Sequence, residues 1–207
     1  METGVQLKLE KPIIMTYSRP DTQEIIDLTY REASLDQERT TVRVDTADCK
    51  IYQPWRVGHT DTVYEKVRRD LIGVIQHIFG QEYWIAKDIW GLVYEDNDSA
   101  DAHIHPNADY TAIWFMEADD GCGTLEYFNP DLTIEPKVDM LVIAGAMHTH
   151  GVFPNVERKA KRSCIVMNIH HVEKVITLDN RRGFYTLEGE GYDVDKLRQT
   201  IAERKRN

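Results

Sequence analysis

A chain of 207 residues with 42% hydrophobic and 29% charged residues has the size and composition of a single folded domain, not of a disordered or fibrous segment. The formal net charge of −10 argues against a nucleic-acid partner, which would require clustered Lys and Arg. Three scattered cysteines exclude a disulfide framework or a zinc knuckle, and the lack of a basic leader or a long apolar run predicts a soluble, intracellular, cytoplasmic protein with no membrane partner.

The first part of the chain is predicted to supply flanking strands and supporting helices. Residues 4–17 and 39–51 alternate between apolar and polar side chains, which is typical of half-buried strands. Between them, Ile25, Ile26 and Leu28 favour a helix that begins near Asp21.

The clearest helix is predicted over residues 61–79, where apolar residues recur at intervals of three and four. Thr62 and Glu65 form a capping-box pattern at its start, and Gly80 stands where a left-handed residue commonly ends a helix. We expect its apolar stripe to pack on the outside of a sheet, so this helix supports the fold and takes no part in chemistry.

Further strands follow in quick succession. Residues 83–94 are rich in aromatic and β-branched side chains and predict two strands that separate near Lys87 and Asp88. Residues 95–101 form an acidic loop, and residues 111–116 are apolar on both faces, as in a central strand. Strands are also predicted over 124–128, 138–144, 163–169 and 173–178, and an amphipathic helix over 193–206.

The histidines stand at the two ends of this strand-rich region. In an extended segment alternate side chains share a face, so His103 and His105 can converge on one ion. A sheet that closes on itself can bring the distant His150 to the same place. A facial set of three ligands that leaves coordination positions open for substrate, oxygen or a chelating co-substrate is typical of a non-haem iron oxygenase.

Several motifs extend this pattern. They are H-x-H-P-x-A-x-x-T-A-I-W-F from His103, G-x-G-x-L-x-Y-F-x-P from Gly121, H-x-V-x-P-N from His150 and R-S-x-x-x-x-N from Arg162. Together they resemble the 2-oxoglutarate/iron(II) oxygenases of bacteria and phages, which are relatives of the prolyl hydroxylases. The resemblance covers about residues 88–171.

The resemblance assigns roles to individual residues. It implies that His150 is the distal metal ligand and that Arg162, with Ser163 beside it, binds the far carboxylate of 2-oxoglutarate. A guanidinium can grip a carboxylate with two parallel hydrogen bonds, which agrees with that role. If Arg162 points into the barrel, Asn168 shares its face and can bind co-substrate or substrate. Trp114 and Tyr127 are expected to line the substrate cavity, provided that their side chains face inward.

One departure from the wider superfamily concerns the second metal ligand. The superfamily has H-x-D, with a carboxylate where this chain has His105. We predict His103, His105 and His150 as the ligands and keep Asp109 as an alternate ligand, or as a residue that orients a ligand imidazole. His148 shares a strand face with His150 but lies outside the H-x-V-x-P-N match, so it is not predicted to bind metal.

The sequence therefore predicts a mainly β fold with flanking α-helices, a double-stranded β-helix of the jelly-roll or cupin-like kind. The single domain, 1–207, would comprise flanking elements (1–85), a barrel core with the metal site (86–178) and a C-terminal loop and helix (179–207). The resemblance implies a dioxygenase that uses Fe(II), 2-oxoglutarate and molecular oxygen, with ascorbate as reductant, to hydroxylate an unactivated C–H bond of an amino acid, peptide or small metabolite.

Two other readings remain open. The pattern H-x-H-x-x-x-D over residues 103–109 also approaches the first cupin motif, which would suit a metal dioxygenase or isomerase that needs no 2-oxoglutarate. The second alternative is a non-catalytic β-barrel binding module in which the histidines are incidental.

Overall fold

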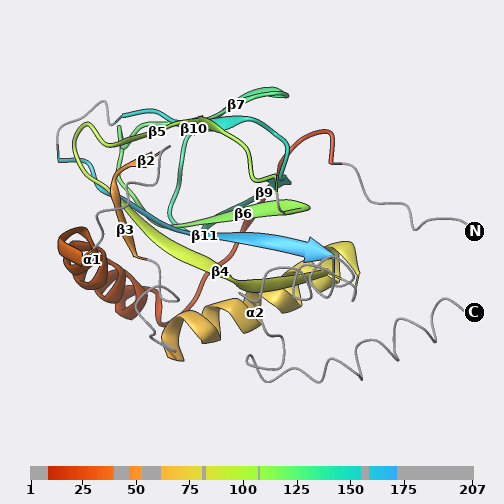
Figure 1. Ribbon diagram of the computed structural model, residues 1–207, viewed down its shortest axis with the longest axis horizontal. Helices are drawn as coiled ribbons and strands as arrows, with labels where there is room; N and C mark the ends of the chain where they lie inside the picture. Colours follow the sequence, from red (N-terminus) through yellow and green to blue (C-terminus); the bar gives the residue numbers. More distant parts are fainter. Residues whose placement is uncertain are drawn as a thin grey trace, which may run out of the picture.

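The computed structural model describes residues 9–39, 47–52, 62–80, 83–106, 108–154 and 159–171. Two antiparallel sheets face one another across a common interior (Figure 1). The larger sheet has the order β1 (Ile13–Thr16), β9 (Met140–Gly145), β6 (Tyr110–Ala118), β11 (Arg162–His171), β4 (Tyr83–Tyr94) and β3 (Lys50–Tyr52). The smaller sheet has the order β2 (Ala47–Asp48), β5 (Ser99–His103), β10 (His150–Val152), β7 (Leu125–Phe128) and β8 (Asp131–Ile134).

From β4 onward the chain passes back and forth between the two sheets. β4, β6, β9 and β11 lie in the larger sheet, whereas β5, β7, β8 and β10 lie in the smaller one. This alternation is the winding of a double-stranded β-helix and confirms the predicted fold. It also brings β5 and β10 together as neighbours, with His103 opposite His150 in the register.

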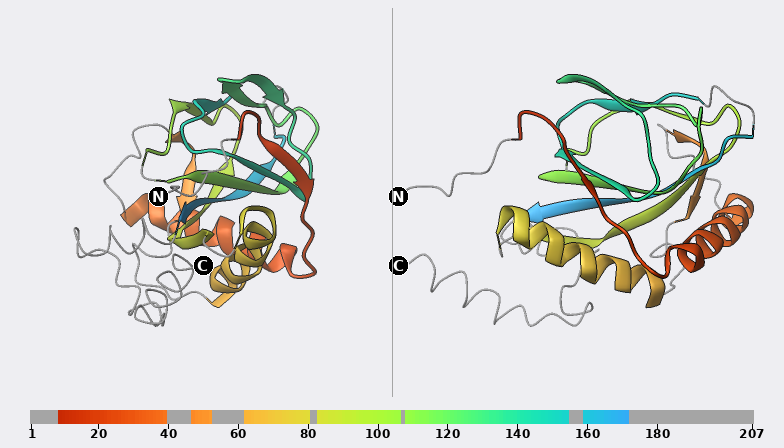
Figure 2. Two further views of the ribbon diagram at one scale, coloured as in Figure 1. Left: turned by 90° about the vertical axis from the view of Figure 1, so that its right-hand side faces the viewer. Right: turned by 180° about the vertical axis from the view of Figure 1, so that it is seen from behind.

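Two helices, α1 (Thr22–Arg39) and α2 (Thr62–Phe79), cover the outer face of the larger sheet (Figure 2). Their apolar side chains form one core with the strand residues that face outward. Ile25 of α1 and Leu71 of α2 belong to this core, as do Trp114 of β6 and Ile165 of β11. Gly80 has a φ of 109°, which fits the predicted left-handed end of α2. Among the described residues, no helix combines the length and apolarity needed to cross a membrane.

A second core fills the space between the sheets. It contains Phe115 and Val166 from the larger sheet and Leu125 and Tyr127 from the smaller one. Each central strand therefore contributes alternate residues to the two cores, as the pleat requires.

Several predicted elements differ from the observed ones. Residues 83–94 form one strand, not two, and the predicted break survives only as an irregularity in the β4–β11 pairing between Met167 and Ile169. Strand β8 and the pairing of residues 99–101 within β5 were not expected. The strand predicted over 173–178 and the helix over 193–206 lie outside the described residues.

Candidate metal centre and anion site

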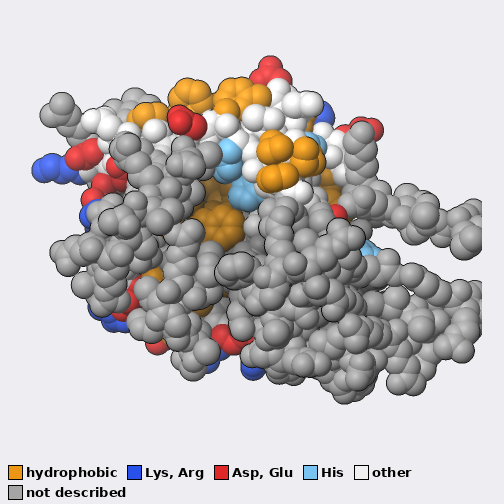
Figure 3. Space-filling model, viewed as in Figure 1, with side chains coloured by type: hydrophobic (Ala, Val, Ile, Leu, Met, Phe, Trp, Pro, Cys, Tyr) orange, Lys and Arg blue, Asp and Glu red, His pale blue; other side chains and the backbone are white. Residues whose placement is uncertain are grey.

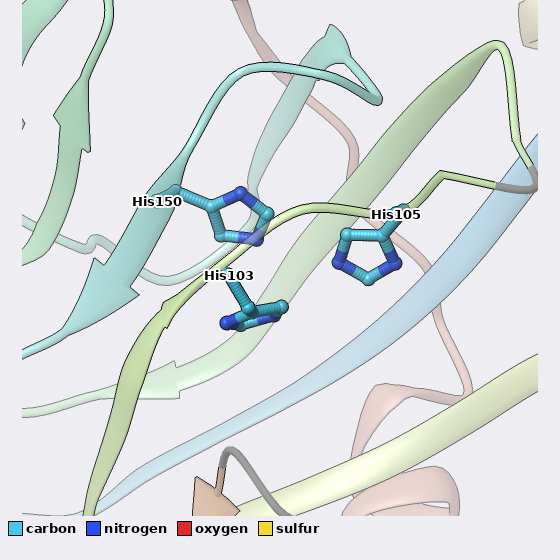
Figure 4. Close-up of side chains that lie close together, drawn as sticks. All are labelled: His103, His105 and His150. Atoms are coloured by element: carbon cyan, nitrogen blue, oxygen red, sulfur yellow. The ribbon is translucent and has the colours of Figure 1, made fainter.

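The three predicted histidines come together at one end of the barrel. His150 is on β10, His103 ends β5, and His105 lies in the loop that follows, where its backbone N–H donates to Ala146 O at 2.8 Å. One potential ligand atom from each histidine lies within 4.8 Å of the others. Figure 4 shows the three rings turned toward a common centre. Imidazole nitrogens at these separations form a plausible donor set for a divalent transition metal.

Two of the imidazoles are held in a defined tautomer by backbone carbonyl groups. Nδ1 of His103 lies 2.7 Å from Asp101 O, and Nδ1 of His150 lies 2.9 Å from His148 O. Because a carbonyl oxygen only accepts hydrogen bonds, each Nδ1 must carry the proton, which leaves Nε2 with its lone pair for a metal. The two rings are thus preorganised in the state that a metal requires.

Burial also favours the neutral form of the distal histidine. His150 is 3% exposed, and this burial lowers its pKa from 6.5 to about 4, so protons compete little with a metal at neutral pH. His103 and His105 are half-buried. In Figure 3, histidine side chains are visible in the opening between the two sheets, with hydrophobic side chains around them.

Asp109 is not brought to the histidine cluster. Its carboxylate accepts a hydrogen bond from the backbone N–H of His171 at 2.7 Å, and its backbone bonds to Ile169 and Ala146. These contacts join the start of β6 to the end of β11. The side chains that lie close enough together to share a metal ion are those of the three histidines, and Asp109 is not among them.

Arg162 lies inside the barrel and is 1% exposed. Its guanidinium packs 4.2 Å from the ring centroid of Tyr94, and its Nη2 donates to Phe153 O at 3.4 Å. Neither Nε nor Nη1 has a hydrogen-bond partner among the described residues, and no ion pair with a described carboxylate is formed. A buried cation with unsatisfied donors is costly, so this group is suited to receive an anion.

Among the described residues, the cysteines that interact with Arg162 do not supply that anion. All three cysteines, Cys49, Cys122 and Cys164, interact electrostatically with the guanidinium. Burial raises the pKa of each thiol, that of Cys164 to about 12, so the thiols stay neutral at physiological pH. The sequence showed the cysteines as scattered, and the fold brings all three within electrostatic range of Arg162.

The residue beside Arg162 inside the barrel is Cys164, whereas Ser163 points the other way. In the β11–β4 register, Ser163 lies opposite Val93 of the helix-side core, whereas Cys164 lies opposite Leu92 of the interior core. Paired residues in a sheet share a face, so the Ser163 hydroxyl is directed toward the helices. The expectation that Ser163 assists Arg162 therefore has no support in its placement.

Asn168 lies further along β11 on the interior face. It shares strand parity with Cys164 and Val166 of the interior core and pairs with Thr111 of β6. Six residues separate it from Arg162, a span of roughly 20 Å in a strand. Asn168 is thus separated from the guanidinium. It lies near the end of β11 at which the backbone N–H of Asp109 donates to Ile169 O.

The two aromatic residues predicted to line the cavity lie on different sides of the fold. Tyr127 faces the interior, with its ring 5.4 Å from that of His150 and its buried hydroxyl without a partner among the described residues. Trp114 instead lies in the helix-side core, where it packs edge-on against Tyr17 at 5.1 Å. A half-buried tryptophan that the sequence did not single out, Trp90, stacks on His105 with 6.0 Å between ring centroids.

Comparisons with known proteins agree with the fold. No protein-family model matches the chain, and no curated protein matches it in sequence. Among solved structures, the chain is similar to a viral collagen prolyl hydroxylase from Paramecium bursaria Chlorella virus-1 in a 2-oxoglutarate complex, with 12% identity, a TM-score of 0.54, and coverage of 78% of this chain and 96% of that one.

Two cellular enzymes give similar matches. A prolyl 4-hydroxylase from Pseudomonas putida is 12% identical, with a TM-score of 0.55 over 79% of this chain and 94% of that one. A prolyl hydroxylase from Trichoplax adhaerens, in complex with a hypoxia-inducible-factor peptide fragment, is 16% identical, with a TM-score of 0.55 over 82% and 87%. At these identities the likeness concerns the fold, which is the double-stranded β-helix of the prolyl hydroxylases.

Proposed function

We propose that this chain is a 2-oxoglutarate- and Fe(II)-dependent dioxygenase, similar to prolyl hydroxylases, that hydroxylates an unactivated C–H bond. The observation that carries the proposal is the buried guanidinium of Arg162, which pairs with no carboxylate of the described residues and lies inside the same barrel as three convergent imidazoles. A metal site alone would not need this cation. A dicarboxylate co-substrate needs both groups, because one end chelates the metal and the other end requires a counter-charge.

The residues of the chain would have three separate roles, which are metal binding, co-substrate binding and exclusion of water. His103, His105 and His150 hold the metal, which when bound supplies the redox chemistry that activates oxygen. Arg162 fixes the far carboxylate through its unpaired Nε and Nη1 groups, and the unpartnered hydroxyl of Tyr127 offers a further hydrogen bond inside the barrel. The apolar residues of the interior core keep water away from the site.

The substrate and oxygen must both reach the metal site through the opening between the two sheets. Amino acids, peptides and small metabolites are the proposed class, and the peptide bound by the Trichoplax neighbour makes peptides a natural first choice for assay. Half-buried Trp90 beside His105 replaces Trp114 as the aromatic residue placed to contact such a substrate.

Release of succinate from 2-oxoglutarate tests the proposal. The purified chain is incubated with Fe(II), ascorbate and 2-oxoglutarate, alone and with a panel of amino acids and peptides, and succinate is measured. We expect turnover that requires both Fe(II) and 2-oxoglutarate, with ascorbate present to keep the iron reduced. A chain that binds metal through the same histidines yet releases no succinate under any condition would instead favour the cupin-type alternative.

Ligand variants sharpen the same assay. H103A and H150A are expected to lower metal affinity by more than about 100-fold, since removal of outer-shell partners alone costs about 10- to 100-fold. H148A is the matched control, because His148 is close in sequence to His150 and bonds to its ring through a backbone carbonyl, which the substitution keeps. Equal metal content in H150A and H148A would contradict the assignment.

A further inference from the structure

The turn between β6 and β7, residues 119–124, lies directly behind the anion site. Asp119 is bonded twice to the residue that precedes Arg162, because its backbone N–H donates to Lys161 O and its carboxylate accepts from Lys161 N–H, both at 2.9 Å. The backbone N–H of Cys122 donates to Asp119 O at 3.1 Å and closes the turn. One side of this turn therefore holds the start of β11.

The other side of the turn holds the carbonyl group that the guanidinium contacts. Phe153 N–H donates to Thr124 O at 3.0 Å, while Phe153 O accepts from Nη2 of Arg162. Gly123 lies against this segment so closely that a Cβ placed on it would overlap Phe153 O and approach Pro154 O to 2.7 Å. Both obstacles are backbone atoms, which cannot rotate away as a side-chain end can.

Gly123 is required here for two separate reasons. Its φ of 79° lies in the left-handed region, and the backbone of 153–154 occupies the space where its side chain would be. The first reason is common in turns. Only the second couples this residue to the position of the guanidinium.

We propose that Gly123 and Asp119 are positioning residues for the anion site, and that they set the affinity for the co-substrate by fixing Arg162 from both ends. Asp119 fixes the backbone from which the Arg162 side chain extends, and Gly123 allows the Phe153 carbonyl to lie where Nη2 can donate to it. The inference rests on the proposed function, because 2-oxoglutarate is the anion that Arg162 is taken to bind.

The test compares G123A with G121A in the full-length chain. Gly121 has a nearly identical φ of 76° and is exposed, so it reproduces the backbone strain in the same turn at an exposed position. We expect G123A to raise the KM for 2-oxoglutarate by about 10- to 100-fold, since a displacement of about 1 Å at a binding group can cost about 100-fold. G121A should change it by no more than about twofold.

Metal affinity distinguishes a local effect on Arg162 from a general loss of structure, because only a general loss of structure would also weaken metal binding. Binding of Mn(II) to both variants is measured by calorimetry in parallel with the KM, at a temperature where circular dichroism shows them folded. We expect Mn(II) affinity to stay within about twofold of the unmodified chain, because His103 and His105 lie on other segments and His150 lies in β10, which is paired with a strand on each side. An equal KM in G123A and G121A would overturn the proposal.

Asp119 gives an independent test if G123A does not fold. D119N retains an oxygen that can accept from Lys161 N–H, whereas D119A removes it. The KM for 2-oxoglutarate should rise in D119A and return toward normal in D119N, and equal values in the two variants would refute the role of Asp119. If the unmodified chain neither binds nor turns over 2-oxoglutarate, it is the proposed function that fails.

Discussion

Arg68 and Arg162 are both buried, on opposite sides of the larger sheet, but they differ in what compensates their charge. Arg68, on α2, is 2% exposed and donates to both carboxylate oxygens of Glu65, at 2.7 and 2.8 Å. Arg162 is 1% exposed and faces a tyrosine ring, a carbonyl group and neutral thiols. An arginine that serves the fold has its own anion within the chain, whereas one that serves a ligand leaves that position to the ligand.

The largest effect is expected when the two arginines are replaced in turn. R162Q should raise the KM for 2-oxoglutarate at least about 30-fold, since losing one partner of a buried charge pair costs about 2–5 kcal/mol. R68Q should leave that KM within about twofold and lower the melting temperature instead. Steady-state kinetics and thermal unfolding of both variants check this, and a similar KM in the two would remove the distinction between the arginines.

A second prediction concerns packing on the helix side of the sheet. Gly91 of β4 faces the hydrogen bond between Thr29 Oγ1 and Tyr64 Oη, and a Cβ there would overlap Tyr64 Oη and lie 2.5 Å from Thr29 Cγ2. G91A should therefore lower the free energy of unfolding by about 3 kcal/mol, at the upper end of typical overpacking costs. Urea denaturation measures this, and G73A is the control because nothing lies within 4 Å of that position. Equal stability of the two variants would show that the helix side is not closely packed.

The smallest expected effect comes from giving Arg162 an anion of its own. C164D places a carboxylate on the same strand face, two residues away, and so imitates the arrangement of Arg68 with Glu65. The new carboxylate competes with the ligand, so the KM for 2-oxoglutarate should rise about tenfold, or about 1.4 kcal/mol. C164S is the control of similar size without the charge. If C164D and C164S bind 2-oxoglutarate equally, the guanidinium is not the group that the co-substrate contacts.

Much of this arrangement could be predicted because it depends on local patterns. The spacing of His103 and His105 and the apolar periodicity of residues 61–79 follow from strand and helix geometry, whereas the motif that marked His150 came from the family resemblance. The winding of the double-stranded β-helix then places His103 opposite His150 without further information.

What could not be predicted depends on which face each residue presents. β6 is buried on both faces from Tyr110 to Met116, so its pattern of side chains did not mark Trp114 as facing the helices. Strand alternation places Cys164 on the same face as Arg162, but the sequence alone did not show that this face is the barrel interior. Cys49, Cys122 and Cys164 come within electrostatic range of Arg162 only because the fold brings together segments far apart in sequence.

The account depends on one ligand engaging both the imidazoles and the guanidinium. Calorimetric titration of 2-oxoglutarate into the anaerobic chain, with and without Fe(II), tests this directly. We predict one site per chain whose affinity falls sharply when Fe(II) is withheld, when His150 is replaced by Ala, and when Arg162 is replaced by Gln. Binding that is unchanged by all three alterations, or no binding to the Fe(II)-loaded chain, would contradict the account.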